Sequence, residues 1–307
     1  MRQISPDTLL EIIDAQVRLV SLGTNLSAVI DEASAVATRL TGADGAVVEL
    51  LERDEIVYRS ASGSAEAQLG LRMPVANSLS GYCLLNRVAA TCTDSEIDER
   101  VNREACRKVG LRSMVIVPLI ADRKAIAVMK LVWREPRALE NNEVEIAQLL
   151  ANMCAVLMHQ ASLEGNDVLQ RRLTVDEATG VANRAYFFEQ LRSRVQAAEK
   201  ESGRVGVGLV RMDEVEPGTE AAILTCIETE CREGDFVARV AANEFAVILS
   251  MAVRQSVVAS QVLRVSHALA RNGFGPVCSG SALLPDHGRT AADLFYAATG
   301  ALARNAA

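Results

Sequence analysis

The chain has 307 residues, which favours two domains at roughly 100 to 200 residues each. Half of the residues are hydrophobic and 23% are charged, enough apolar material for two buried cores, so extensive disorder is not expected. A net charge of −7 without any Lys/Arg run makes nucleic acid an unfavourable partner. The longest apolar runs, Met114 to Ala121 and Phe245 to Val253, are too short to cross a bilayer, so membrane insertion is not expected.

Cysteine and histidine usage points to a reducing compartment and away from two enzyme classes. The seven cysteines are odd in number and form no CxxC pair, so neither a disulfide framework nor a zinc site is expected. None of the three histidines lies in an HExxH pattern or beside a GxSxG serine, which leaves metalloprotease and serine hydrolase activity unsupported. We therefore expect a cytoplasmic protein without a metal site.

The first part of the chain is predicted to form two helices and then a sheet. Apolar residues recur at helical spacing over 6–40, with a break at Gly23 and an end at Thr41-Gly42. Two strand pairs follow, over 46–51 and 55–61 and later over 114–120 and 125–133. These runs predict a central sheet with helices laid over it.

A helical pattern at near-heptad spacing covers 140–173. The apolar stripe thins after Leu163, where residues 164–167 interrupt it. Two interpretations stay open: a terminal helix packed on its own sheet, or a connecting helix that couples two domains in a dimer. The apolar stripes at both ends of the first domain predict a homodimer that pairs through its terminal helices.

The remaining chain, 175–307, is predicted as a second domain. After a helix over 185–200, strands and helices follow in the order βαββαβ. That order is ferredoxin-like, an antiparallel sheet with helices on one face. The predicted class is therefore α/β of the α+β kind. The segments are an N-terminal helix (1–25), a first domain (26–160), a connecting helix (140–174) and a second domain (175–307).

The first domain resembles the GAF family. The residues that carry the resemblance are Thr41 to Asp44, Ser78 to Gly81, Asp94 to Arg100 and Gly110 to Leu119. The resemblance implies a cytosolic sensory module that is often dimeric through its terminal helices. Members bind cyclic nucleotides, tetrapyrroles or other small molecules, or nothing.

The absence of certain residues from this domain limits the classes of ligand that it is expected to bind. No histidine precedes His159, which disfavours a bilin or haem, and no phenylalanine precedes Phe187, which disfavours the cyclic-nucleotide site of the family. No cofactor is expected. The candidate pocket residues are Tyr82, Cys83, Cys92 and Asp94. The alternative interpretation is a core aromatic, two small buried thiols and a helix-capping Asp.

The second domain is similar to GGDEF (diguanylate cyclase) domains. Residues Asp176 to Arg184 resemble the family's opening motif DxLTGLxNR, and Cys278 to Ala282 with Pro285 and Gly288 match its end. In the family, two GTP molecules meet at a homodimer interface, where carboxylates hold Mg²⁺. The signature hairpin departs from the family, because residues 241–245 read Ala-Ala-Asn-Glu-Phe in place of Gly-Gly-Asp/Glu-Glu-Phe.

Each departure weakens the implied chemistry. Ala241 and Ala242 add methyl groups where glycines let the backbone approach a nucleotide, with a penalty if φ must be positive. Asn243 replaces a carboxylate with an amide, and Arg211 places a cation where the family has an acid. The base-reading motifs FKxIND and GHxxGD are absent, and Glu244 is interpreted as a solvated hairpin residue.

One binding motif of the family is retained. Arg232 to Asp235 match the RxxD of the inhibitory site that binds cyclic di-GMP, where an Arg fork and an Asp contact guanine or phosphate. The alternative is an Arg at a helix end followed by a turn. The sequence thus predicts a non-catalytic, bacterial-type signalling protein that acts on an unknown protein partner. The alternative is a cyclic di-GMP effector, and an active cyclase is supported only by overall similarity.

Overall fold

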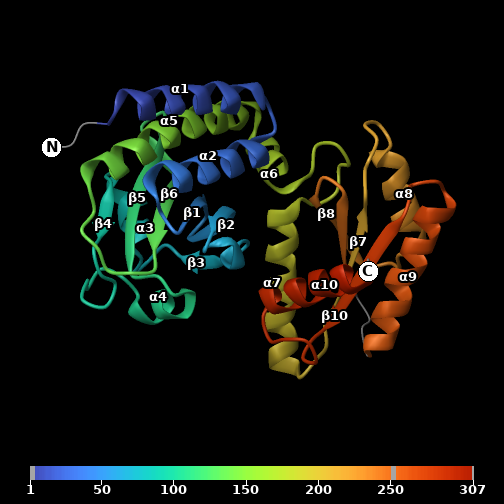
Figure 1. Cartoon of the computed structure of the whole chain (residues 1–307). Helices are drawn as coiled ribbons and strands as arrows, with labels where there is room; N and C mark the ends of the chain where they lie inside the picture. The colour runs from blue at the N-terminus through green and yellow to red at the C-terminus, as the bar shows by residue number, and fades with distance from the viewer. Residues whose placement is uncertain (1–3, 250–253, 306–307) are drawn as a thin grey trace. The chain divides into compact units, whose positions relative to one another are not determined.

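Residues 4–249 and 254–305 are described by a computed structural model of the chain. The chain divides into two compact units, Met1–Leu173 and Thr174–Ala307 (Figure 1). Each unit contains an antiparallel sheet with helices packed against it. The mixed helix-and-sheet class expected from the sequence is therefore confirmed. The strand predicted over 244–251 is seen to Leu249, and its last two residues lie outside the described residues.

The first unit is built on a six-stranded sheet of order β3-β2-β1-β6-β5-β4. The strands are β1 (Gly45–Glu52), β2 (Glu55–Gly63), β3 (Arg72–Pro74), β4 (Ala90–Cys92), β5 (Ser113–Ala121) and β6 (Lys124–Trp133). The four long strands are those predicted. The edge strands β3 and β4 were not predicted, because three residues are too few to show an alternation of apolar and polar side chains.

Helices cover both faces of this sheet. On one face lie α1 (Pro6–Ser21), α2 (Leu26–Thr41) and α5 (Asn141–Glu164), as Figure 1 shows. Val48 and Leu50 of β1 point into the core beneath these helices, because alternate strand residues face the same side. Against the other face lie α3 (Leu79–Asn86) and α4 (Arg103–Val109), with the short 3₁₀ turn η1 (Glu66–Gln68) after β2. The second apolar cluster of the unit is buried on that face.

The helix predicted over 140–173 is two helices. It ends at Glu164, where Gly165 adopts φ 136°, and α6 (Asn166–Thr174) follows. Leu169 and Leu173 are buried in the core of the first unit, so this segment packs on its own unit. By length and composition alone α5 is apolar enough to cross a membrane, but in this fold many of its apolar residues are buried in that core.

The second unit carries a four-stranded sheet of order β10-β7-β9-β8. Its elements are α7 (Arg184–Glu201), β7 (Gly206–Met212), α8 (Glu220–Glu230), β8 (Phe236–Ala241), β9 (Glu244–Leu249), α9 (Gln255–Arg271), β10 (Val277–Leu283) and α10 (Ala291–Asn305). All neighbouring strands are antiparallel, the arrangement expected for βαββαβ. The expectation of helices on one face only was wrong. Whereas α8 and α9 cover one face, α10 packs against Gly280 on the other, with α7 beside it through the Phe187–Phe295 ring contact.

Close approach of α10 to the second sheet depends on Gly280. A Cβ built there would lie 2.2 Å from the carbonyl oxygen of Ala298 and 2.8 Å from the backbone nitrogen of Leu302. We expect Gly280→Ala to lower the free energy of unfolding of this unit by about 1–3 kcal/mol, because backbone atoms of α10 must move. Urea unfolding followed by circular dichroism measures the change.

Gly300, on the same helix, is the matched control. No atom lies within 4 Å of a Cβ built at this position. Gly300→Ala is therefore expected to raise the free energy of unfolding by about 0.5–1 kcal/mol, since alanine has the better helix propensity. Equal effects of the two substitutions would show that α10 does not contact the sheet at Gly280.

Candidate functional site

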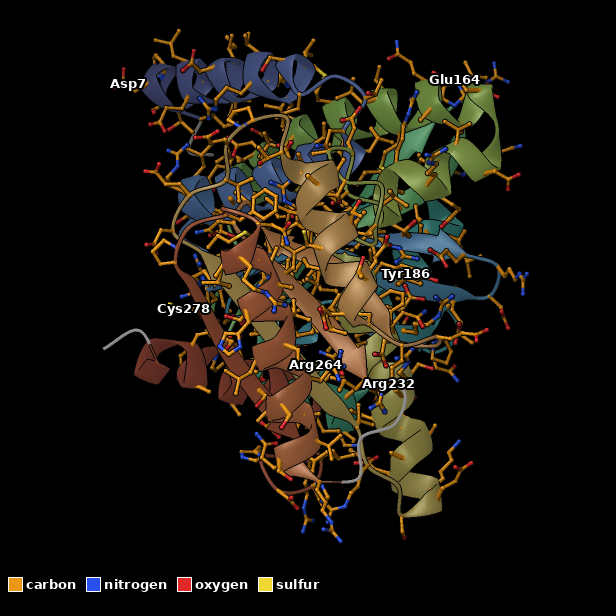
Figure 2. All side chains as sticks on the ribbon, turned by 90° about the vertical axis from the view of Figure 1, so that its right-hand side faces the viewer. Asp7, Glu164, Tyr186, Arg232, Arg264 and Cys278 are labelled. Atoms are coloured by element: carbon orange, nitrogen blue, oxygen red, sulfur yellow. The ribbon has the colours of Figure 1, made fainter. Side chains whose placement is uncertain are left out.

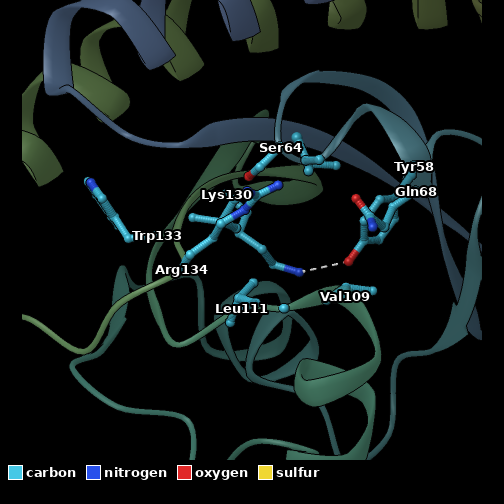
Figure 3. Close-up of a pocket in the computed structure, with 12 residues that line it drawn as sticks. Tyr58, Ser64, Gln68, Val109, Leu111, Lys130, Trp133 and Arg134 are labelled. Atoms are coloured by element: carbon cyan, nitrogen blue, oxygen red, sulfur yellow. Dashed lines mark hydrogen bonds between the residues drawn. The ribbon is translucent and has the colours of Figure 1, made fainter.

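Two adjoining cavities lie against the face of the first sheet that α3 and α4 cover. They share the lining residues Tyr58, Val109, Leu111 and Lys130. The larger holds about 560 Å³ of space that no protein atom fills, part of it open to solvent. Most of its wall is apolar, and Figure 3 shows the smaller cavity with Lys130 and Tyr58 side by side. An apolar pocket with a few converging polar groups is the usual form of a small-molecule site.

The polar end of the cavities is a buried cluster of Glu49, Tyr58 and Lys130. Glu49 pairs with Tyr58 across β1 and β2, and Lys130 of β6 pairs with Val47, two residues before Glu49. The Lys130 ammonium donates to Glu49 Oε1. It also donates to the Tyr58 hydroxyl over 3.1 Å, as Figure 3 shows. Glu49 is fully buried and the Lys130 side chain is 9% exposed.

Burial and charge act against each other on these groups. Burial alone would lower the pKa of Lys130, but the Glu49 carboxylate and Tyr58 outweigh burial, so the pKa of Lys130 is raised. Burial and then the Glu49 charge raise the pKa of Tyr58 to about 12. Lys130 is therefore charged and Tyr58 carries its proton at neutral pH, so both present hydrogen-bond donors.

The pocket residues expected from the sequence lie elsewhere. Tyr82 is 45% exposed on α3, and Cys92 is buried in the apolar cluster beneath α3 and α4. Asp94 accepts from both Arg112 nitrogens at 2.9–3.0 Å and from the Glu96 backbone N–H at 3.0 Å. None of the three is among the residues that line the two cavities.

The thiols of Cys83 and Cys92 are buried, and Asp94 is held by hydrogen bonds within the protein. Cys83, the other candidate, is fully buried in the same apolar cluster. Burial raises the pKa of the Cys83 and Cys92 thiols to about 12, so neither is a thiolate at neutral pH. The backbone N–H of Glu96 and then Arg112 lower the pKa of Asp94. Sequence analysis missed Glu49 and Lys130, although a charged residue inside an otherwise apolar strand was a visible signal of both.

In the second unit, the altered hairpin joins β8 to β9. Arg211 of β7 lies directly opposite Glu244 of β9, and its guanidinium contacts Glu244 Oε2 at 2.7 Å. The Glu244 side chain is 6% exposed. The interpretation of Glu244 as a solvated residue was wrong, because the sheet buries it and Arg211 neutralises it.

The rest of the hairpin is held by hydrogen bonds within the protein. The Asn243 amide nitrogen donates to the Met212 carbonyl at 2.6 Å, and the Arg239 guanidinium donates to the Ala242 carbonyl at 2.6 Å. Neither Ala241 nor Ala242 has a positive φ, so the expected conformational penalty does not arise. Within residues 4–249 and 254–305, no three His, Cys, Asp or Glu side chains are grouped so as to hold a metal ion.

The opening motif of this unit fixes a turn. Asp176 Oδ1 accepts from the backbone N–H of Thr179 at 3.0 Å and from its hydroxyl at 2.6 Å, while Gly180 has φ 77°. The turn is tied to the sheet where the Arg239 N–H donates to the Ala182 carbonyl at 2.9 Å. These contacts position β8 and the hairpin that follows it.

The RxxD residues form a tight turn between α8 and β8. Asp235 Oδ2 accepts from the backbone N–H of Arg232 at 2.9 Å, and Gly234 has φ 89°. Arg232 is exposed. Arg264, which Figure 2 labels together with Arg232, contacts Glu230 at the end of α8. The turn thus engages the carboxylate of Asp235, and Arg232 lies at the surface.

An antiparallel sheet between helices, with a cavity against one face, defines the first unit as a small domain with room for a ligand. Residues 23–159 match the family model described as GAF domain, and this segment is a GAF domain. It is followed by a second domain whose elements after α7 have the order βαββαβ that the sequence predicted. No curated protein matches the chain.

Solved structures are similar to each part separately. A GAF domain from a phosphoenolpyruvate-protein phosphotransferase of Coxiella burnetii is 16% identical, with TM-score 0.47, over 51% of this chain and 96% of that chain. A GGDEF domain from Pseudomonas aeruginosa is 23% identical, with TM-score 0.38, over 43% of this chain and 87% of that chain. A sensory box/GGDEF family protein from Caulobacter crescentus is 22% identical, with TM-score 0.38, over 43% of this chain and 97% of that chain.

The pairing of Arg211 with Glu244 is testable by a double-mutant cycle. Arg211→Met leaves a buried carboxylate without its partner, and we expect it to lower the free energy of unfolding by about 1–3 kcal/mol. Glu244→Gln in the same chain is expected to restore much of that loss, because the remaining group is neutral. Strictly additive effects in urea unfolding would show that the two side chains do not interact.

Proposed function

We propose that this chain is a cytoplasmic signalling protein in which the GAF domain is the sensor and the GGDEF-like domain acts by binding a protein partner. In this proposal the second domain does not synthesise cyclic di-GMP. The observation that carries it is the Arg211–Glu244 pair at 2.7 Å, because a guanidinium occupies the neighbourhood in which a divalent cation would need free carboxylates. None of the seven cysteines forms a disulfide, which fits a reducing compartment.

The cyclase assay tests the absence of catalysis. Purified full-length protein is incubated with GTP and Mg²⁺, and the product is measured by chromatography. We expect no cyclic di-GMP above that of a protein-free control, because Asn243 and Arg211 supply no anionic oxygen to a metal ion. Sustained synthesis in proportion to protein concentration would overturn the proposal.

A second candidate function is a cyclic di-GMP effector, which the exposed Arg232 favours. An Arg fork at the surface beside an Asp is suited to a guanine or a phosphate. Isothermal titration calorimetry with cyclic di-GMP is expected to give saturable binding that Arg232→Ala lowers at least about tenfold, the equivalent of one charged hydrogen bond. The exposed Arg271→Ala is the control. No heat with wild type, or equal affinity in Arg232→Ala, removes this function.

The proposed assembly is a homodimer that pairs through α1. On this helix Leu10, Ile13, Val17 and Val20 are 52–64% exposed and follow one another at spacings of three, four and three residues. That spacing is the heptad seam of a helical bundle. Ile12, Ala15 and Leu19 on the opposite side are buried in the core, so the exposed stripe is not needed for folding of the unit.

Light scattering tests this assembly. We expect wild type to be a dimer and Val17→Glu to be a monomer, because a carboxylate on each helix would be buried in the seam. Asp14→Gln, on the same helix beside the stripe, is expected to leave the dimer intact. A wild-type monomer at every concentration would contradict the proposal.

A further inference from the structure

The polar end of the GAF cavity is specialised for hydrogen-bond acceptors. Lys130 lines both cavities and donates to two groups of the protein, Glu49 Oε1 and the Tyr58 hydroxyl. An ammonium has three donors, so one N–H is left for a bound molecule. The Tyr58 hydroxyl lies 3.8 Å from the thioether sulfur of Met73, which is a weak acceptor. Glu49 also interacts with this hydroxyl. An oxygen acceptor in the cavity would be a stronger partner for the Tyr58 hydroxyl than the Met73 sulfur, and it would accept the third N–H of Lys130.

The charge behind these donors selects against anions. Glu49 is fully buried, does not line either cavity and neutralises Lys130. Its second oxygen, Oε2, has no hydrogen-bond partner within the described part of the chain. Arg134 lines the smaller cavity, but among the described residues that line the larger cavity Lys130 is the one charged side chain. A carboxylate in the larger cavity would therefore add a second buried negative charge against a single cation, whereas an uncharged carbonyl leaves the site neutral.

The remaining wall of the larger cavity is suited to an apolar body. Its apolar lining residues come from strands β2, β3 and β5, from helices α3 and α4 and from the segments beside them, among them Ile56, Leu71, Met73, Leu79, Val101 and Met114. Methionine side chains adapt their shape to a ligand and contact aromatic rings favourably.

We propose that the GAF domain binds an uncharged, mainly apolar molecule whose carbonyl-type oxygen accepts hydrogen bonds from Lys130 and Tyr58. This inference rests on the proposed sensory role of the domain and names the chemical class that it senses. In this proposal the apolar wall supplies most of the binding free energy. The two donors give specificity for a ligand that carries an oxygen acceptor.

Three probes of one shape test the proposal on the full-length chain: 1-indanone, which carries the carbonyl, indane, which lacks it, and indane-1-carboxylate, which is an anion. Dissociation constants are measured by ligand-observed NMR titration. We expect 1-indanone to bind at least about tenfold more tightly than either of the others, since an acceptor that satisfies buried donors is worth about 1–2 kcal/mol. Equal affinity for indane, tightest binding of the carboxylate, or no binding of 1-indanone overturns the proposal.

Two variants locate the binding. Tyr58→Phe removes one donor and keeps the ring, so the preference for 1-indanone over indane is expected to fall severalfold, whereas Tyr82→Phe, on an exposed ring outside the cavities, is expected to leave it unchanged. Val109→Trp fills the space shared by both cavities and is expected to abolish binding, with Lys108→Trp on the same helix as the control.

The inference is overturned if Tyr58→Phe prefers 1-indanone over indane as strongly as wild type does, or if Val109→Trp binds 1-indanone with wild-type affinity. Circular dichroism establishes that each variant is folded. These results are independent of the cyclase assay. Loss of the inference therefore leaves the non-catalytic role of the GGDEF-like domain standing, and the reverse also holds.

Discussion

A carboxylate buried in a sheet needs a cation beside it, and both units of this protein obey that constraint. Glu49 is paired with Lys130 on the next strand of the first sheet, and Glu244 is paired with Arg211 on the next strand of the second. Removing one partner from such a pair leaves an uncompensated charge, which costs far more than the pair contributes. The residue types at these four positions are therefore linked in pairs, and each pair determines what its neighbourhood can bind.

The two pairs have opposite consequences. Lys130 lines both cavities, so the first pair places a polar group in the mainly apolar wall of the larger one. Arg211 instead pairs with Glu244 beside the hairpin that joins β8 to β9. The side chains of Asn243 and Arg239 donate hydrogen bonds to backbone carbonyls at this turn. One sheet thus has a cavity with a polar end, whereas in the other sheet the buried acid is held in an ion pair.

Sequence patterns sufficed for the elements whose signals are local. The four long strands of the first unit, the two N-terminal helices and the βαββαβ order were predicted, because each depends on periodicity or on caps such as Ser5 and Gly42. The resemblance to GGDEF domains implied that Arg211 stands where that family has an acid, but not that it pairs with Glu244. The short edge strands and the division of the long helix at Gly165 were not predicted. Three residues are too few to show a periodic pattern, and one glycine does not by itself mark the end of a helix.

The sequence by itself determined the order of the elements, the motifs that resemble GAF and GGDEF domains, and the presence of Arg211 and Asn243 where the second resemblance implies acids. Only the tertiary structure decided which side chains meet. Tyr82, Cys92 and Asp94 are close in the chain but do not line the cavities, whereas Glu49, Tyr58 and Lys130, up to 81 residues apart, form their polar end. The physical reason is that strand register brings distant residues onto one face of a sheet, and no local pattern encodes that register.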